Sequence, residues 1–182
     1  KKYQEIVPRQ IDRINALIEK LLRFGQPREL SLHEFYLNQV IEEVLNLIEN
    51  QCKKKKIFTK KDLSKLPKMK GDSERLSQVF MNLFLNAIQA MPQGGTLSVR
   101  CSVRSLTYVC IEVSDTGFGI PADKLDKVFD PFFSSKEDGS GMGLAVAYRI
   151  VKEHGGEINV ESEVGRGTEF RIWLPIRPER LV

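Results

Sequence analysis

The apolar residues of the chain recur with two different periods, which predict helices and strands. Near the start they are spaced alternately by four and three residues, at Val7, Ile11, Ile14, Ile18 and Leu21. This heptad pattern predicts an amphipathic helix that packs in a helical bundle or a dimer. Packing of the helix on its own domain is the alternative. Phe24-Gly25-Gln26-Pro27 ends the helix.

Two further helices have an apolar stripe. The first follows Asn38, a candidate N-cap, with apolar positions at Ile41, Val44, Leu45 and Ile48. The second is expected over residues 72–90, with its stripe at Leu76, Val79, Phe80, Leu83, Phe84, Ala87 and Ile88. Asn82 and Asn86 are four residues apart beside this stripe, so they lie on one face of the helix. Because asparagine is a poor helix former, the pair suggests a functional role.

Other segments alternate between apolar and polar residues and predict strands. They are residues 29–37, 96–103, 108–114, 157–163 and 168–174. A short helix is expected over 122–128. A longer one is expected over 145–154, where Gly155-Gly156 would end it as a glycine C-cap.

Charge is unevenly distributed along a chain of ordinary domain size. The 182 residues are 41% hydrophobic, which is enough for a core, and the net charge of +4 is modest. Nine lysines and one aspartate between Cys52 and Lys70 give this segment a net charge of +8. No aromatic or glycine-rich reading motif is interleaved with it, so we expect a solvated loop or exposed strand and no nucleic-acid partner.

The three cysteines, Cys52, Cys101 and Cys110, show no metal-ligand spacing. Cys101 alternates in phase with its apolar neighbours and Cys110 does not, which places them on opposite faces of one hairpin. We therefore expect free thiols in a reducing compartment. No apolar run has the length of a membrane span and no signal peptide opens the chain, so a cytoplasmic location is expected.

The strongest chemical signal lies between Asp115 and Leu144. This stretch contains Asp115-Thr116-Gly117-Phe118-Gly119-Ile120 and, later, Gly139-Ser140-Gly141-Met142-Gly143-Leu144. Closely spaced glycines lack the Cβ atoms that would hold a phosphate away, and they allow N–H groups to point inward. The second motif runs into a helical pattern, and a helix N-terminus favours an anion. The pattern predicts a nucleotide ligand.

Four motifs together resemble the ATP-binding catalytic domain of sensor histidine kinases, whose superfamily includes gyrase, the mismatch-repair ATPases and a heat-shock chaperone. They are Asn82-Leu83-x-x-Asn86-Ala87, Asp115-x-Gly117-x-Gly119, Gly139-x-Gly141-x-Gly143-Leu144 and Gly165-x-Gly167-Thr168. Four motifs in the family's order are more specific than one glycine triplet. The similarity extends from about Leu30 to Pro175. Residues 1–27 resemble the end of a dimerisation helix with its linker, which leaves residues 28–182 for the ATP-binding domain.

The resemblance implies a fold and two ligands. The fold is α/β, a two-layer sandwich in which three helices cover one face of a mixed β-sheet, preceded by part of the dimerisation helix. The ligands are ATP and Mg²⁺. Asn86 would ligate the magnesium through its amide oxygen, a hard ligand of the kind this ion takes, and Asn82 would support it. Asp115 would accept a hydrogen bond from the adenine amino group.

The remaining contacts implied by the resemblance surround the base and the phosphates. Gly119 and Ile120 would bound the base, with Gly117 in the same nucleotide-binding set, and Thr168 would reach the base directly or through water. The phosphates would meet backbone N–H groups of Gly141, Met142, Gly143 and Leu144. A short lid over residues 129–138 would bring Lys136 to the γ-phosphate, so that Asn86 and Lys136 carry the catalytic roles. Gln89, Phe133, Gly139 and Ser140 complete the implied nucleotide-binding set. Ser134 stands where many members of the family have a lid arginine.

Asn82 also separates two possible activities. The gyrase and mismatch-repair branches have a glutamate at this position, which serves as general base for hydrolysis, and an amide cannot take a proton from water. The resemblance therefore implies transfer of the γ-phosphoryl group to an external nucleophile. The acceptor would be a histidine on the dimerisation helix upstream of this chain, and a response-regulator aspartate would follow. The full-length protein would be a homodimer.

Other functions stay open at this point. His33 and His154 are both expected to be structural, because neither lies in an acceptor-like helix. One alternative is a catalytically silent nucleotide-binding module that acts by docking. Another, in which the glycines are only turns and the lysine segment binds nucleic acid, requires that ATP does not bind.

Overall fold

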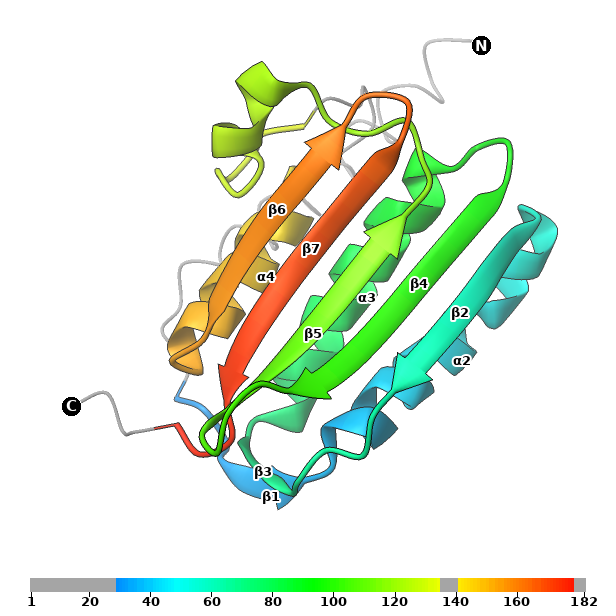
Figure 1. The fold of residues 1–182 in the computed structure, drawn as a ribbon. Helices are drawn as coiled ribbons and strands as arrows, with labels where there is room; N and C mark the ends of the chain where they lie inside the picture. Colours follow the sequence, from blue (N-terminus) through cyan, green and yellow to red (C-terminus); the bar gives the residue numbers. More distant parts are fainter. Residues whose placement is uncertain (1–28, 135–140, 179–182) are drawn as a thin grey trace, which may run out of the picture.

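Three α-helices pack on one face of a five-stranded sheet in the computed structural model, which describes residues 29–134 and 141–178 (Figure 1). The helices are α2 (Leu37–Lys54), α3 (Ser73–Ala90) and α4 (Gly143–Glu153). The strands of the sheet are β2 (Ile57–Leu63), β4 (Gly95–Val103), β5 (Tyr108–Asp115), β6 (Glu157–Glu163) and β7 (Gly167–Pro175). The helix expected near the start of the chain lies outside the described residues.

The sheet is mixed, in the order β2-β4-β5-β7-β6. Strand β2 runs parallel to β4, and every other pair is antiparallel. The short strands β1 (His33–Phe35) and β3 (Met69–Gly71) form a separate antiparallel pair at one end of the molecule (Figure 1). Together with the three helices on one face, this arrangement confirms the predicted α/β fold class.

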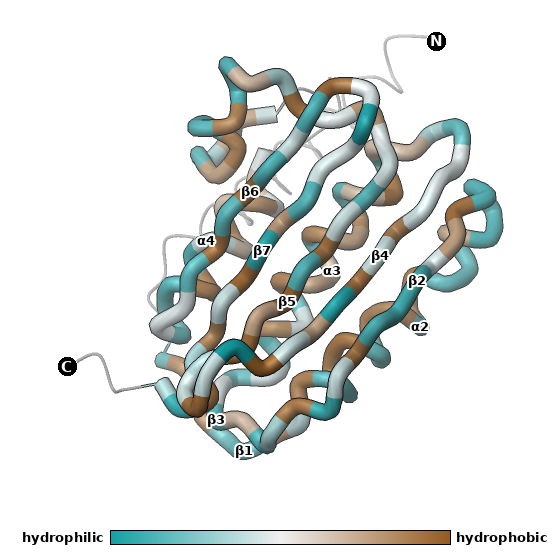
Figure 2. The backbone as a smooth tube through the Cα atoms, viewed as in Figure 1, coloured by the Kyte–Doolittle hydropathy of each residue, from teal (hydrophilic) through white to brown (hydrophobic). Residues whose placement is uncertain are grey.

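The two faces of the sheet differ because side chains alternate along each strand. In Figure 2, hydrophobic and hydrophilic positions follow one another along the strands. The face toward the helices is apolar, with buried Leu97, Val99, Val113, Phe170, Ile172 and Leu174. The opposite face carries exposed ion pairs, such as Arg171 with Glu161 and Glu169. Each such pair contributes about 0–1 kcal/mol to the stability of the fold. Burial of the apolar side chains between the sheet and the helices therefore holds these two layers together.

Helix α3 lies at the centre of the helix layer, in contact with both α2 and α4. Its N-cap is Asp72, whose side chain accepts a hydrogen bond from the N–H of Arg75 at 3.1 Å. All seven residues of its predicted apolar stripe are buried. The predicted helix boundary and stripe are therefore confirmed, and the stripe fixes which face of α3 is left for Asn82 and Asn86.

Four local predictions were wrong or only partly right. Asn38 is not an N-cap: α2 begins one residue earlier, and the Asn38 amide donates to the Ser64 carbonyl at 2.9 Å. The strand expected over 29–37 is confined to β1. The segment expected as a short helix is the 3₁₀-helix η1 (Ala122–Lys127). Helix α4 begins two residues before the expected start, at Gly143.

The lysine-rich segment contains the end of α2, all of β2 and the first two residues of β3. Strand β2 was not predicted as a separate element, although an exposed strand was one expectation for this segment. Its side chains from Phe58 to Asp62 are all exposed, because β2 is an edge strand. Exposure on both faces removes the alternation from which a strand is recognised.

The predicted free thiols and the opposite faces of Cys101 and Cys110 are confirmed. All three cysteines are buried free thiols. Cys101 lies opposite Ile111 and Cys110 lies opposite Ser102 in the β4–β5 pair, which puts the two thiols on different faces of the sheet. Among the described residues, no helix is both long enough and apolar enough to cross a membrane.

Candidate nucleotide-binding site

Hydrogen bonds bring together the four motifs that lie far apart in the sequence. Asn82 on α3 donates from Nδ2 to the carbonyl of Gly143 at the start of α4, at 2.9 Å. The N–H of Phe118, in the loop after β5, donates to the carbonyl of Ala90 at the end of α3, at 3.1 Å. The carbonyl of Phe118 accepts from the N–H of Gly165 between β6 and β7, at 2.9 Å. The sequence motifs therefore form one site.

The two asparagines of α3 differ in their contacts. Asn82 is engaged with Gly143, so its amide orients the first turn of α4. Asn86 is half-buried one turn later, and we find no hydrogen bond from its amide to any other residue that the structure describes. Gln89 is exposed in the last turn of the helix. Asn86 is thus the asparagine whose side chain is available to a ligand.

Asp115 ends β5 at the edge of the apolar layer, where it is 9% exposed. Its Oδ1 accepts a hydrogen bond from the N–H of Gly117 at 2.8 Å, which turns the chain out of the strand. Thr168, 6% exposed, is its partner on β7. Two oxygen-bearing side chains are therefore adjacent at the end of the sheet, on the side where the helices pack.

Gly119 fixes the shape of the loop that follows Asp115. Its φ of +72° lies in the left-handed region, and a Cβ there would overlap the backbone carbonyl of Glu163 on β6. Only glycine combines this backbone angle with this close approach. The next residue, Ile120, is half-buried and donates its N–H to the Ser162 hydroxyl at 2.7 Å.

The start of α4 supplies the part of the site suited to an anion. Met142 is the buried N-cap residue, and its carbonyl accepts from the N–H of Val146 at 2.9 Å. The first-turn N–H groups of an α-helix have no partner within the helix, and they carry partial positive charge. Gly143 and Leu144 lie in that turn. The glycine motif therefore precedes a helix N-terminus, as the sequence predicts.

The segment predicted to be the lid, residues 129–138, is described only in part. The carbonyl of Gly141 accepts from the N–H of Phe132 at 3.1 Å, which ties the two ends of this segment together. Phe133 is half-buried, and its N–H donates to the Asp130 carbonyl at 3.2 Å. Lys136, Gly139 and Ser140 lie outside the described residues, so their roles stay predictions.

Sequence reasoning missed Ser162. Its hydroxyl contacts Ile120, Gly167 and Thr168, and so joins the loop after β5 to the start of β7. One signal could have identified it: Ser162 is in phase with Ile158 and Val160 on β6, which makes it a polar residue on the apolar face of a strand.

A second unpredicted contact joins the start of α3 to the end of α4. His154 is 2% exposed, and its Nε2 accepts from the N–H of Asp72 at 3.0 Å. Its Nδ1 donates to the carbonyl of Ile150 at 2.8 Å, so the ring is neutral. Burial lowers the pKa of His154 below its ordinary value. The prediction that this histidine is structural agrees with these contacts.

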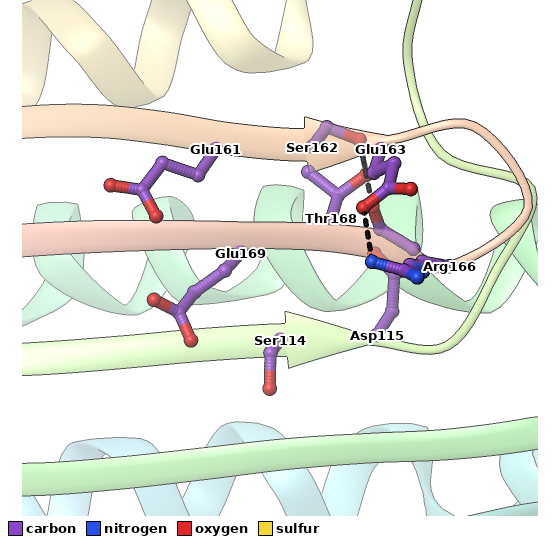
Figure 3. Close-up of a pocket in the computed structure, with 9 residues that line it drawn as sticks. Ser114, Asp115, Glu161, Ser162, Glu163, Arg166, Thr168 and Glu169 are labelled. Atoms are coloured by element: carbon purple, nitrogen blue, oxygen red, sulfur yellow. Dashed lines mark hydrogen bonds and ion pairs between the residues drawn. The ribbon is translucent and has the colours of Figure 1, made fainter.

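A hollow of about 370 Å³ lies where β5 and β6 end and β7 begins (Figure 3). In Figure 3, Ser114, Glu161 and Glu169 project from the strands on the side away from the helices. Glu163 also lines the hollow and pairs with Arg166 at 2.7 Å. The carboxylates outnumber the single guanidinium, so this hollow repels a triphosphate. Asp115, Gly167 and Thr168 also line the hollow, so it shares residues with the site formed by the four motifs.

An α/β sandwich with an acidic residue at a strand end and glycines before a helix N-terminus defines a nucleotide-binding domain. The family described as histidine kinase-, DNA gyrase B-, and HSP90-like ATPase matches residues 71–178, more than half of the sequence. The chain therefore belongs to this family. The predicted resemblance to histidine-kinase ATP-binding domains is confirmed.

Known relatives agree with this assignment. The sensor histidine kinase ZraS of Escherichia coli is 41% identical over 179 residues, which cover 97% of this chain and 38% of ZraS. The chain thus spans well under half the length of this relative. The histidine kinase ThkA, in complex with the response regulator protein TrrA, superposes with a TM-score of 0.80 at 30% identity, over 99% of this chain and 52% of ThkA. Full-length ShkA in complex with AMPPNP superposes with a TM-score of 0.81 at 28% identity, over 96% of this chain and 38% of ShkA.

Proposed function

We propose that this chain binds Mg-ATP and transfers the γ-phosphoryl group to a histidine on a separate dimerisation bundle, which then supplies a response-regulator aspartate. The observation that carries the proposal is the set of hydrogen bonds that joins α3, the helix of Asn86, to the start of α4 and to the loop after Asp115. The complex of ThkA with a response regulator supports the choice of partner. In this scheme residues 1–27 belong to the dimerisation helix, residues 28–182 form the catalytic domain and the full-length protein is a homodimer.

The base would lie against the end of β5. Asp115 is an anionic acceptor in a largely buried position, and it suits the amino group of adenine. Guanine carries an oxygen at the same place, and two acceptors repel. Gly117 and Gly119 have no side chains that could block the base, and Ile120 adds an apolar edge. The nucleotide analogue bound to ShkA is named as AMPPNP, which also contains adenine.

The phosphates would lie at the N-terminus of α4, where the N–H groups of Met142, Gly143 and Leu144 are available as donors. Asn86 fits a magnesium ligand, because its amide is hard, half-buried and without a hydrogen bond among the described residues. The described residues contain no cluster of three His, Cys, Asp or Glu side chains that could hold a metal. A metal here would therefore take one amide oxygen from Asn86 and the rest of its shell from phosphates and water. When bound, Mg²⁺ neutralises charge on the phosphates.

Transfer is favoured over hydrolysis by the contact of Asn82. The hydrolysing branches of the superfamily resemble this fold but have a glutamate here. The Asn82 amide donates to Gly143, so it acts as a structural donor and cannot serve as a base. The chain therefore positions ATP and leaves activation of the nucleophile to the acceptor. Lys136 completes the proposal as the contact to the γ-phosphate.

The test uses γ-labelled ATP, magnesium, this chain and a separate bundle of the parent protein that carries the acceptor histidine. We expect acid-labile, base-stable label on the bundle. Asn86→Ala should abolish both the label and magnesium-dependent ATP binding. Asn46→Ala, an exposed position on α2, is the matched control and should retain both.

Three other results would change the conclusion. ATP binding without label on the bundle would favour the docking module that does not transfer phosphate. Absence of ATP binding would refute the nucleotide site. Unchanged magnesium dependence in Asn86→Ala would refute the metal assignment alone.

A further inference from the structure

We infer that Ser162 sets the base specificity of this site, because it forces the hydroxyl of Thr168 to act as a hydrogen-bond acceptor. The inference rests on the proposed function and adds a positioning residue to it. Ser162 belongs to none of the four motifs, and its side chain reaches the site from the buried face of β6. The argument depends on where the hydroxyl hydrogens lie.

Ser162 has one hydrogen to donate and two lone pairs. Its oxygen lies 2.7 Å from the Ile120 nitrogen, whose N–H can only donate, so one lone pair is used. Its oxygen also lies 2.8 Å from the carbonyl oxygen of Gly167, which can only accept. Two oxygens at that distance without a hydrogen between them would repel, so the Ser162 hydrogen points to Gly167.

The remaining contact of Ser162 is with the hydroxyl oxygen of Thr168, at 3.0 Å. Because the hydrogen of Ser162 is already used, the hydrogen of Thr168 must occupy this contact. The Thr168 hydroxyl then has only lone pairs to offer in other directions. Without Ser162, the same hydroxyl could rotate and donate.

This orientation matters because Thr168 is the cross-strand partner of Asp115. The site then offers two neighbouring acceptors and no hydroxyl donor from Thr168. Such a pair suits the exocyclic amino group of adenine, directly or through a water molecule. It disfavours a base with a carbonyl oxygen in the same position. Adenine selection therefore depends on three residues on three strands, which are Asp115 on β5, Ser162 on β6 and Thr168 on β7.

The experiment measures the dissociation constants of ATP and inosine triphosphate by calorimetry, with magnesium present. Inosine triphosphate replaces the amino group by a carbonyl oxygen and changes nothing outside the base. We expect Ser162→Ala to reduce the preference for ATP by about tenfold, the effect of one hydrogen bond. Ser162→Thr keeps the hydroxyl and should keep the preference. Ser98→Ala, a strand serine on the opposite face of the sheet, is the matched control and should have no effect.

Thr168→Val removes the hydroxyl and keeps the shape of the side chain. In a Thr168→Val background, Ser162→Ala should no longer change the ratio of the two dissociation constants. Thermal unfolding of each variant shows whether it folds, and only folded variants that bind nucleotide are compared.

If Ser162→Ala unfolds at a lower temperature but keeps the wild-type ratio, Ser162 is only structural and the inference is wrong. A wild-type chain that binds ATP and inosine triphosphate equally also overturns it, while the proposed nucleotide site stands. A wild-type chain that binds neither overturns both.

Discussion

The hydrogen bond between Asn82 and Gly143 provides the sharpest test of how the site is assembled. Asn82→Asp keeps the size of the side chain but replaces the donating NH₂ by an oxygen. A carboxylate oxygen would then face the Gly143 carbonyl, which the amide nitrogen now contacts at 2.9 Å. Loss of the bond costs about 1 kcal/mol, and the unpaired, half-buried carboxylate beside a carbonyl oxygen adds about 1–2 kcal/mol. The expected loss in the free energy of unfolding is thus about 2–3 kcal/mol.

The free energy of unfolding is measured by denaturant unfolding, and Tm is measured separately by thermal unfolding. For a domain of this size, the loss corresponds to a decrease in Tm of about 4–12 °C. Asn46→Asp makes the same chemical change at an exposed position of α2 and should stay within about 0.5 kcal/mol of the wild type. Below about pH 4 the new carboxyl becomes protonated and can donate again, so the difference between Asn82→Asp and the wild type should shrink. Equal stability losses in Asn82→Asp and Asn46→Asp would refute the reasoning.

Three other measurements test the backbone, the buried histidine and the thiols. Gly165 has a φ of +80° and open space around it, so Gly165→Ala should lower the free energy of unfolding by about 1–2 kcal/mol through left-handed backbone strain. Gly119 has a similar φ of +72°, but a Cβ there meets a β6 carbonyl. Denaturant unfolding should therefore show a loss about 1–3 kcal/mol larger for Gly119→Ala. Burial holds the pKa of His154 below 6.5, and the Arg75 guanidinium acts in the same direction, while the carboxylates of Asp72 and Glu153 oppose the shift. Below pH 6.5 the unfolded chain therefore binds more protons than the folded one. The free energy of unfolding should therefore fall more between pH 7 and pH 5 in the wild type than in His154→Gln, and equal slopes would contradict this account. Burial raises the pKa of Cys101 to about 12, so iodoacetamide at pH 8 should leave it unmodified in the native protein and alkylate it after unfolding, as mass spectrometry would show.

Local patterns gave most of the elements and the motifs. The stripe of α3 was predictable because burial of a helix face needs a fixed period, and the stripe contains that period over its whole length. The glycine motifs were predictable for a different reason, since only glycine permits the backbone angles and close contacts of these loops. The edge strand β2 escaped prediction because its side chains are mostly exposed and show no period.

Tertiary structure alone decided which polar side chains meet. The sequence identified Asn82 as unusual, but only the packing of α3 against α4 makes it the partner of Gly143. The phase of Ser162 on β6 marks it as a polar residue on an apolar face, but does not say which groups it meets. Nothing in the sequence indicates the contact of His154 with Asp72, two residues 82 positions apart in the chain. A hydrogen bond requires two groups within about 3 Å and in the right direction. Residue type and spacing determine which groups can donate or accept, and the sheet register and helix packing determine which of them come within that distance.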